Sequence, residues 1–128
     1  MDIEKLKQIG EVTQFKKGET IIYQGLYGEE MYIILKGNVE VFVLNPFDGT
    51  EAHVAELGAG DVFGEMSIFH GGKRSATIRA MDTCLMFRIT KDGLDKYIKM
   101  DPSMAVKLMK IIAKRLVDAE QYLDVKRN

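Results

Sequence analysis

GDVFGEMSIFHGGKRSATI, residues 60–78, carries the most specific information in this sequence about fold and function. Gly64 can take a positive φ or let the backbone approach a ligand closely. Residues 65–70 can form one or two helical turns, whose first N–H groups have no partner inside the helix and attract an anion. Arg74 follows a pair of glycines, and its planar guanidinium matches two oxygens of a phosphate. The stretch therefore predicts an anion site.

Glu65 indicates what kind of phosphate this site would accept. A carboxylate beside an anion repels it unless the ligand also offers hydroxyl donors to the carboxylate. A ribose phosphate does so, because its 2′-hydroxyl can donate to Glu65 while Arg74 and the turn amides hold the phosphate. The residues thus favour a phosphate that bears a sugar over inorganic phosphate. They leave open whether that phosphate is cyclic.

Short β-rich runs lie on both sides of this stretch, separated by glycines at the spacing of a small barrel or jelly roll. Valine alternates with other residues over 39–43, as in a strand with one face on a core. Asn45-Pro46-Phe47-Asp48-Gly49 predicts a turn between two antiparallel strands. The runs that we expect to be strands are residues 20–23, 31–35, 39–43, 50–57, 76–79 and 85–89.

Helical patterns border the strands at both ends of the chain. Apolar residues three apart over residues 2–9 predict a short helix that ends near Gly10. Thr90 can cap a helix over about 91–99. Asp101 and Pro102 can open a longer helix over about 102–125, as cap and first helical residue.

The order of these elements predicts an α+β fold in one domain, residues 1–128. We expect an antiparallel β-roll, similar to a jelly-roll barrel, over about 11–89. A short N-terminal helix precedes the roll, and two C-terminal helices follow it, the last one long. At 128 residues the chain is too short for two domains with proper cores.

Composition restricts the functions that this chain can have. The formal net charge of −1 gives no basic surplus for binding nucleic-acid phosphates. Cys84 is the single cysteine, so it forms no internal disulfide and belongs to no zinc cluster, and an inert buried thiol is expected. The chain has neither a signal-peptide pattern nor an apolar run of membrane-spanning length. We therefore expect a soluble cytoplasmic protein with no membrane contact.

Residues 60–78 resemble the phosphate-binding cassette of cyclic-nucleotide-binding domains, as found in catabolite activator protein, the protein kinase A regulatory subunit and nucleotide-gated channels. The interval of nine from Glu65 to Arg74 is one that this family uses. Leu26 and Lys73 depart from the family pattern, at positions away from the expected phosphate contacts. The matching residues are Phe63-Gly64-Glu65, Ser67, Ile68 and Arg74-Ser75-Ala76-Thr77, with a second match upstream at Ile21-Ile22, Gly25, Gly28, Met31-Tyr32-Ile33-Ile34 and Gly37.

This resemblance implies a role for each residue of the site. Glu65 would bind the ribose 2′-hydroxyl and Arg74 the cyclic phosphate. The ligand would be cAMP or cGMP, with cAMP favoured by the similarity to bacterial members, although the Ser75 hydroxyl could reach the guanine amino group. No cofactor and no catalysed reaction are expected. The full set of expected ligand-binding residues is Phe63, Gly64, Glu65, Met66, Ser67, Arg74, Ser75 and Ala76.

The last helix carries more apolar residues than a single packing contact needs. One row is Met104, Leu108, Ile111, Ile112, Leu116, Ala119 and Leu123, and a second is Ala105, Met109, Ala113 and Val117. We expect this helix to close over the base, to signal by moving, and to form a homodimer with a second copy. No helix-turn-helix follows it, so we expect no DNA binding by this chain and an output through a separate effector protein.

Two other functions remain open from the residues alone. One is a nucleotide-free module of the same fold that serves interaction or dimerisation, with Arg74 and Glu65 paired on a loop surface. The other is a barrel enzyme. His53 and His70 lie far apart in sequence without further ligands at suitable spacing, and no nucleophile–base set is present, so neither metal nor catalytic residues are predicted.

Overall fold

The computed structural model describes the backbone of residues 3–127 and the side chains of residues 4, 7–114 and 117. The chain forms two compact units, Met1–Leu94 and Asp95–Asn128. The first unit holds all the strands and the whole of residues 60–78.

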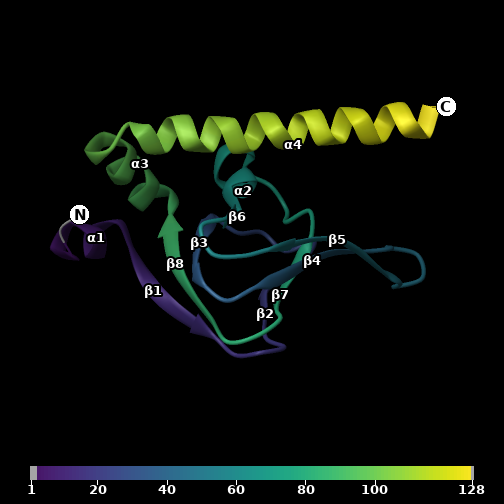
Figure 1. The fold of residues 1–128 in the computed structure, drawn as a ribbon, viewed down its shortest axis with the longest axis horizontal. Helices are drawn as coiled ribbons and strands as arrows, with labels where there is room; N and C mark the ends of the chain where they lie inside the picture. Colours follow the sequence, from purple (N-terminus) through teal and green to yellow (C-terminus); the bar gives the residue numbers. More distant parts are fainter. Residues whose placement is uncertain (1–2, 128) are drawn as a thin grey trace. The chain divides into compact units, whose positions relative to one another are not determined.

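Two four-stranded antiparallel sheets build the first unit (Figure 1). One sheet has the order β1 (Gly10–Phe15), β8 (Cys84–Thr90), β3 (Glu30–Lys36), β6 (Val62–Phe63), and the other has the order β2 (Thr20–Ile22), β7 (Thr77–Ala80), β4 (Val39–Leu44), β5 (Glu51–Leu57). Helix α1 (Ile3–Ile9) precedes β1, and helix α2 (Glu65–His70) lies between β6 and β7. The antiparallel β-roll expected from the sequence is confirmed.

Alternating residues of these strands make a core between the two sheets. The ring of Tyr32 stacks on that of Phe63 with centroids 5.1 Å apart, and Phe15 meets Tyr32 edge-on at 6.2 Å. These ring contacts anchor β6 within residues 60–78, directly before Gly64 and α2. The buried members of the cluster are Ile22, Tyr32, Ile34, Val39, Phe63, Ile78, Ala80, Cys84 and Met86.

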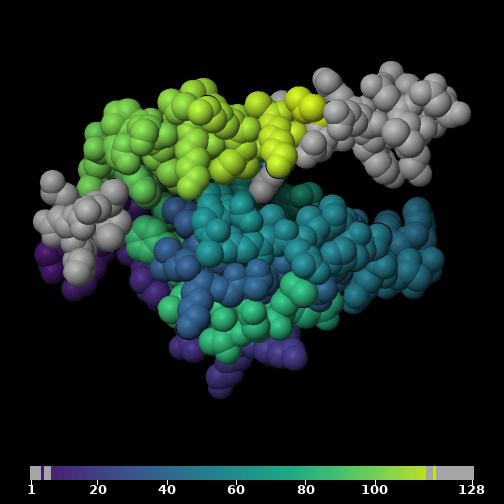
Figure 2. Space-filling view, viewed as in Figure 1, coloured from purple at the N-terminus to yellow at the C-terminus, as the bar shows by residue number. Residues whose placement is uncertain are grey.

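The β4–β5 hairpin ends in the turn expected at residues 45–49. The side chain of Asn45 accepts a hydrogen bond from the Phe47 amide, and that of Asp48 accepts one from the Thr50 amide. Gly49 has φ of +74°, which only glycine adopts at low cost. The turn is exposed, with Phe47 96% accessible, and is visible in blue-teal at the right of Figure 2.

Both C-terminal helices begin at their expected caps. The Thr90 hydroxyl accepts the Gly93 amide at the start of α3 (Lys91–Met100), and the Asp101 carboxylate accepts the Ser103 amide at the start of α4 (Ser103–Arg127). In α4, Met104 and Leu108 are buried, whereas Met109 and Val117 of the second apolar row are exposed. The side chains of Leu116, Ala119 and Leu123 lie outside the described residues. No described helix is long and apolar enough to cross a membrane.

Candidate functional site

Two glycines with positive φ bracket the helical turn of residues 60–78. Gly64 (φ +83°) is the N-cap of α2, and its cap position has no side-chain hydrogen bond. Gly71 (φ +67°) ends the helix and donates its N–H to the carbonyl of Ser67 at 3.0 Å. The short helix predicted from the sequence is therefore present. Its sharp entry and exit depend on backbone conformations that glycine provides.

Arg74 is held at both its side chain and its backbone. Its Nη1 donates to the carbonyl of Gly64 at 3.1 Å and its Nη2 to the carbonyl of Glu30 at 2.9 Å. Its backbone is hydrogen-bonded to the β2–β3 loop. The N–H of Arg74 donates to the carbonyl of Leu26 at 2.8 Å, and the carbonyl of Arg74 accepts from the N–H of Gly25 at 2.9 Å. Guanidinium has five N–H groups, so the fork keeps donors for an anion beyond those bound to the two carbonyls.

The charge of Arg74 is buried, since only 8% of the residue is accessible. Burial lowers the pKa of Arg74, and the nearby Tyr32, Glu30 and Glu65 raise it. Arginine stays protonated under such conditions, so the site holds a cation that has lost most of its water. A bound phosphate would supply the opposite charge to this desolvated cation.

Glu65 opens α2 and is completely buried. Its carboxylate is close enough to Arg74 to influence the charge of that residue. A buried carboxylate is costly unless neighbouring groups compensate its charge. Glutamate is therefore seldom fully buried unless it is paired. The reading of Arg74 and Glu65 as a surface pair is wrong, because both residues lie inside the roll.

The other expected site residues differ in their surroundings. Phe63 is in the core, so its side chain serves to anchor the cassette. Met66 is exposed and Ser67 is buried, both on the first turn of α2. Ser75 is exposed and Ala76 is partly buried, on the chain between Arg74 and β7. The fold therefore brings Gly64, Glu65 and Arg74 together, with Ser75 and Ala76 beside them in the chain.

Gly28 approaches the guanidinium of Arg74 in a way that the sequence did not reveal. A Cβ atom at Gly28 would lie 2.4 Å from Nη2 and 2.6 Å from Cζ of Arg74. A Cβ at Gly64 would lie 3.0 Å from Nη1. Two glycines from distant parts of the chain thus leave the room that the guanidinium occupies. The glycine pattern marked both positions, but only the fold shows that they share this neighbour.

Glu30 is a second feature that sequence reasoning missed. Its carboxylate is bound by Arg88 at 2.9 Å and by the Tyr32 hydroxyl at 3.3 Å, and Arg88 also binds Glu11. The hydrogen bond from Arg88 holds the pKa of Glu30 below its usual value. This network fixes the first residue of β3, whose carbonyl accepts from Arg74. A backbone acceptor leaves no signal in residue type, so no sequence pattern could have identified it.

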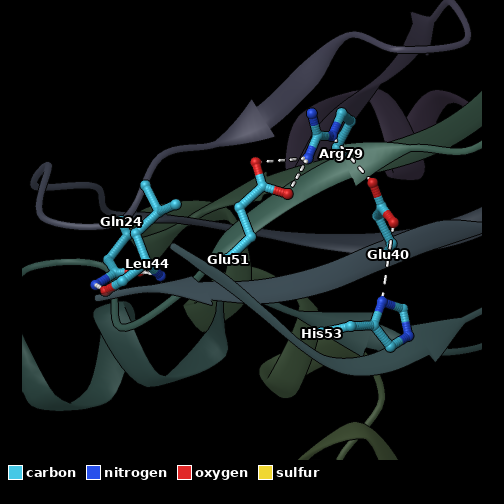
Figure 3. Close-up of polar contacts among 6 residues, drawn as sticks. All are labelled: Gln24, Glu40, Leu44, Glu51, His53 and Arg79. Carbon is cyan, nitrogen blue, oxygen red and sulfur yellow. Dashed lines mark hydrogen bonds and ion pairs between the residues drawn. The ribbon is translucent and has the colours of Figure 1, made fainter. Parts of the chain in front are cut away.

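Polar residues on β4, β5 and β7 form a separate network outside the cassette (Figure 3). Arg79 binds Glu40 at 3.0 Å and Glu51 at 3.4 Å, and its guanidinium lies 4.4 Å from the ring centroid of Phe42. His53 is 3.8 Å from Glu40. Among the described residues, no group of three or more His, Cys, Asp or Glu is placed to hold a metal ion.

Comparison with known proteins gives matches over this same region. The family model of the cyclic nucleotide-binding domain matches residues 12–101. The cyclic AMP receptor protein of Thermus thermophilus is 32% identical over 111 residues, 87% of this chain and 51% of the relative. A CRP-like cAMP-activated global transcriptional regulator of Mycobacterium tuberculosis is 32% identical over 102 residues, 80% of this chain and 45% of the relative. This chain thus spans about half the length of these curated relatives.

Solved structures show the same fold. The crystal structure of Thermus thermophilus catabolite activator protein has a TM-score of 0.86 and 29% identity, and covers 98% of this chain and 60% of its own. The EAL enzyme Bd1971 has been solved in cAMP-bound and cGMP-bound forms. Each form has a TM-score of 0.66 and 29% identity, and covers 83% of this chain and 28% of its own.

Proposed function

Because the chain belongs to the cyclic nucleotide-binding domain family, we propose that it binds a cyclic nucleotide through residues 63–76, with cAMP preferred to cGMP. The observation that carries this proposal is the placement of Arg74. Two backbone carbonyls and a two-bond contact with the β2–β3 loop fix a buried cation beside Glu65. That arrangement fits a ligand whose phosphate meets Arg74 while a hydroxyl of its ribose meets Glu65.

Each group of the cassette has a defined task in this proposal. Arg74 presents its remaining N–H groups and its charge to the phosphate oxygens. The amides of Gly64, Met66, Ser67, Ser75 and Ala76 add donors around the same anion. Glu65 accepts from the 2′-hydroxyl, which a deoxyribose ligand lacks. The chain catalyses no reaction on the ligand and serves only to sense it.

The preference for cAMP is supported by the names of both sequence relatives, which refer to cAMP. The Bd1971 enzyme has been solved with both nucleotides, so the fold by itself does not discriminate between the bases. Ser75 is the residue whose exposed hydroxyl could contact a guanine amino group in the syn conformation. The relative affinity for cAMP and cGMP therefore depends on whether this contact to guanine contributes more than the contacts to adenine.

Competition titration of a fluorescent cyclic nucleotide tests this proposal. We expect unlabelled cAMP to displace the probe at lower concentration than cGMP. Ser75→Ala should lower the affinity for cGMP several-fold and change that for cAMP by less than about twofold, since one hydrogen bond to a neutral group contributes about 1 kcal/mol. Tighter binding of cGMP would reverse the preference. Displacement by neither nucleotide would leave a nucleotide-free interaction module as the function.

We propose further that ligand binding acts through α4, which signals by movement and pairs with a second copy to form a homodimer. Support comes from the exposed Met109 (61% accessible) and Val117 on one row of the helix. An exposed apolar row of this kind usually has a partner. The output then belongs to a separate effector or to further sequence, and no DNA contact is assigned to this chain.

Analytical ultracentrifugation tests the role of α4. We expect the chain to sediment as a dimer at micromolar concentration, and Met109→Lys with Val117→Lys to convert it to a monomer, because each lysine places a charge in the apolar seam. A variant truncated after Lys114 should keep phosphate binding and lose affinity for the whole nucleotide. A monomeric parent chain at high micromolar concentration, with and without cAMP, would contradict the dimer.

A further inference from the structure

Gln24 makes an unusual set of hydrogen bonds at the edge of the cassette. Its side-chain Nε2 donates to the carbonyl of Leu44 at 3.1 Å, and its Oε1 accepts from the amide of the same residue at 2.7 Å (Figure 3). Its own backbone N–H donates to the Thr77 hydroxyl at 3.0 Å. One side chain therefore satisfies both backbone groups of a residue at the end of β4.

The strand register shows which residue would normally occupy this place. β4 pairs with β7 up to Phe42 and Thr77, and continuing the antiparallel register by two residues would set Leu44 opposite Ser75. The chain does not continue the ladder there, because β7 begins at Thr77. A primary amide has one carbonyl and one N–H₂ group, so Gln24 can replace the peptide group of Ser75 against Leu44.

We propose that Gln24 is a positioning residue of the phosphate site, which releases residues 75 and 76 from β4 by taking the place of Ser75 in the ladder. The inference rests on the proposed function, since the released backbone is the part assigned to the phosphate. In the described part of the chain, no protein group accepts a hydrogen bond from the Ser75 or Ala76 amide. These amides can therefore point to a ligand.

The residues that follow Gln24 complete the same connection. The Gly25 amide donates to the Arg74 carbonyl at 2.9 Å, and the Leu26 carbonyl accepts from the Arg74 amide at 2.8 Å. The loop thus holds Arg74 from one side while the Gln24 side chain fills the vacated position on β4. A change at Gln24 should reach the ligand through the backbone of residues 74–76, although its side chain has no role in contacting the nucleotide.

The test compares Gln24→Met with the parent chain by calorimetric titration of cAMP and by amide hydrogen exchange. Methionine keeps the length of the side chain and removes both polar atoms. We expect the affinity for cAMP to fall about tenfold or more, which corresponds to about 1.4 kcal/mol. We also expect the Leu44 amide to exchange faster. Thr77→Val removes only the hydroxyl that accepts from the backbone N–H of Gln24. It should give a smaller loss of affinity for cAMP.

Asp82→Ala is the matched control for a purely structural effect. The Asp82 carboxylate accepts a hydrogen bond from the backbone N–H of Asn38 at 2.8 Å. Like Gln24, it is a side chain that binds the backbone, but at the opposite end of β4. Both variants should lower the melting temperature, and only Gln24→Met should lower the affinity for cAMP.

The outcomes separate the inference from the proposed function. If the parent binds cAMP and Gln24→Met binds it equally well, the inference is overturned and the proposed function stands. Equal losses of affinity in Gln24→Met and Asp82→Ala at equal loss of melting temperature would also overturn it, since the role would then be structural alone. If the parent binds neither cAMP nor cGMP, the proposed function and the inference both fail.

Discussion

Replacing Arg74 with alanine is expected to abolish measurable binding of cyclic nucleotide while the β-roll stays folded. The variant removes the buried cation and both of its N–H donors to the carbonyls of Gly64 and Glu30. Truncating one member of a buried charged pair costs about 2–5 kcal/mol. This range corresponds to a loss of affinity between about thirty-fold and several thousand-fold. Isothermal titration calorimetry with cAMP measures it, and circular dichroism checks the fold.

Arg79→Ala provides the matched control for this experiment. Arg79 lies on β7, five residues along the chain, and binds Glu40 and Glu51 on neighbouring strands. These partners are partly exposed to solvent, so the pairs contribute little to stability. We expect the affinity for cAMP to stay within about twofold of the parent. Unchanged affinity in Arg74→Ala would show that the cassette is not the binding site.

Gly28→Ala is expected to weaken binding by about tenfold or more, with a moderate loss of stability. The new Cβ would lie 2.4 Å from Nη2 of Arg74, too close for any real contact, so the guanidinium must move. It can do so because it is the end of a flexible side chain, but the movement breaks its hydrogen bonds to the carbonyls of Gly64 and Glu30, which lowers stability. The displaced fork then loses the alignment on which two parallel hydrogen bonds to a phosphate depend. Titration calorimetry measures the affinity, and thermal unfolding measures the stability.

Gly72→Ala tests whether this effect is specific to the position of Gly28. Gly72 belongs to the same cassette, and a Cβ there would meet only the His70 ring at 3.7 Å, an ordinary contact. We expect parent-like affinity in this variant. If Gly28→Ala also binds like the parent, then Arg74 tolerates displacement and its exact place in the roll does not determine affinity.

The comparison of sequence and structure shows which features local patterns can specify. The Asn45–Gly49 turn and the caps at Thr90 and Asp101 depend on neighbouring residues, and the fold contains them. The alternation expected over residues 39–43 is interrupted, because a bulge lies between Val41 and Phe42 and the Phe42 side chain is buried. The cassette could also be located, because Gly64, Glu65 and Arg74 lie within eleven residues of one another. These features need no knowledge of how distant strands pair.

Other features of the site arise only when distant segments meet. Glu30 and Arg88 are 58 positions apart, and Arg74 is 44 positions from the carbonyl that it binds in β3. The acceptor on Glu30 is a backbone atom, which every residue type carries. Gln24 also had no signal, since its role depends on β7 beginning only at Thr77, which leaves Leu44 without a strand partner on that side. Residue types and spacing therefore predicted Arg74 as a site residue. They could not predict the backbone and side-chain contacts that hold it in place.

Thermal unfolding with and without cyclic nucleotide tests the central claim most directly. A ligand that binds only the folded state adds about 2.7 kcal/mol of stability at a concentration one hundred times its dissociation constant. For a domain of this size we expect a rise of about 10 °C in melting temperature with cAMP, a smaller rise with cGMP, and none with either in Arg74→Ala. No rise with millimolar cAMP or cGMP in the parent chain would contradict the assignment of residues 63–76 as a cyclic-nucleotide site.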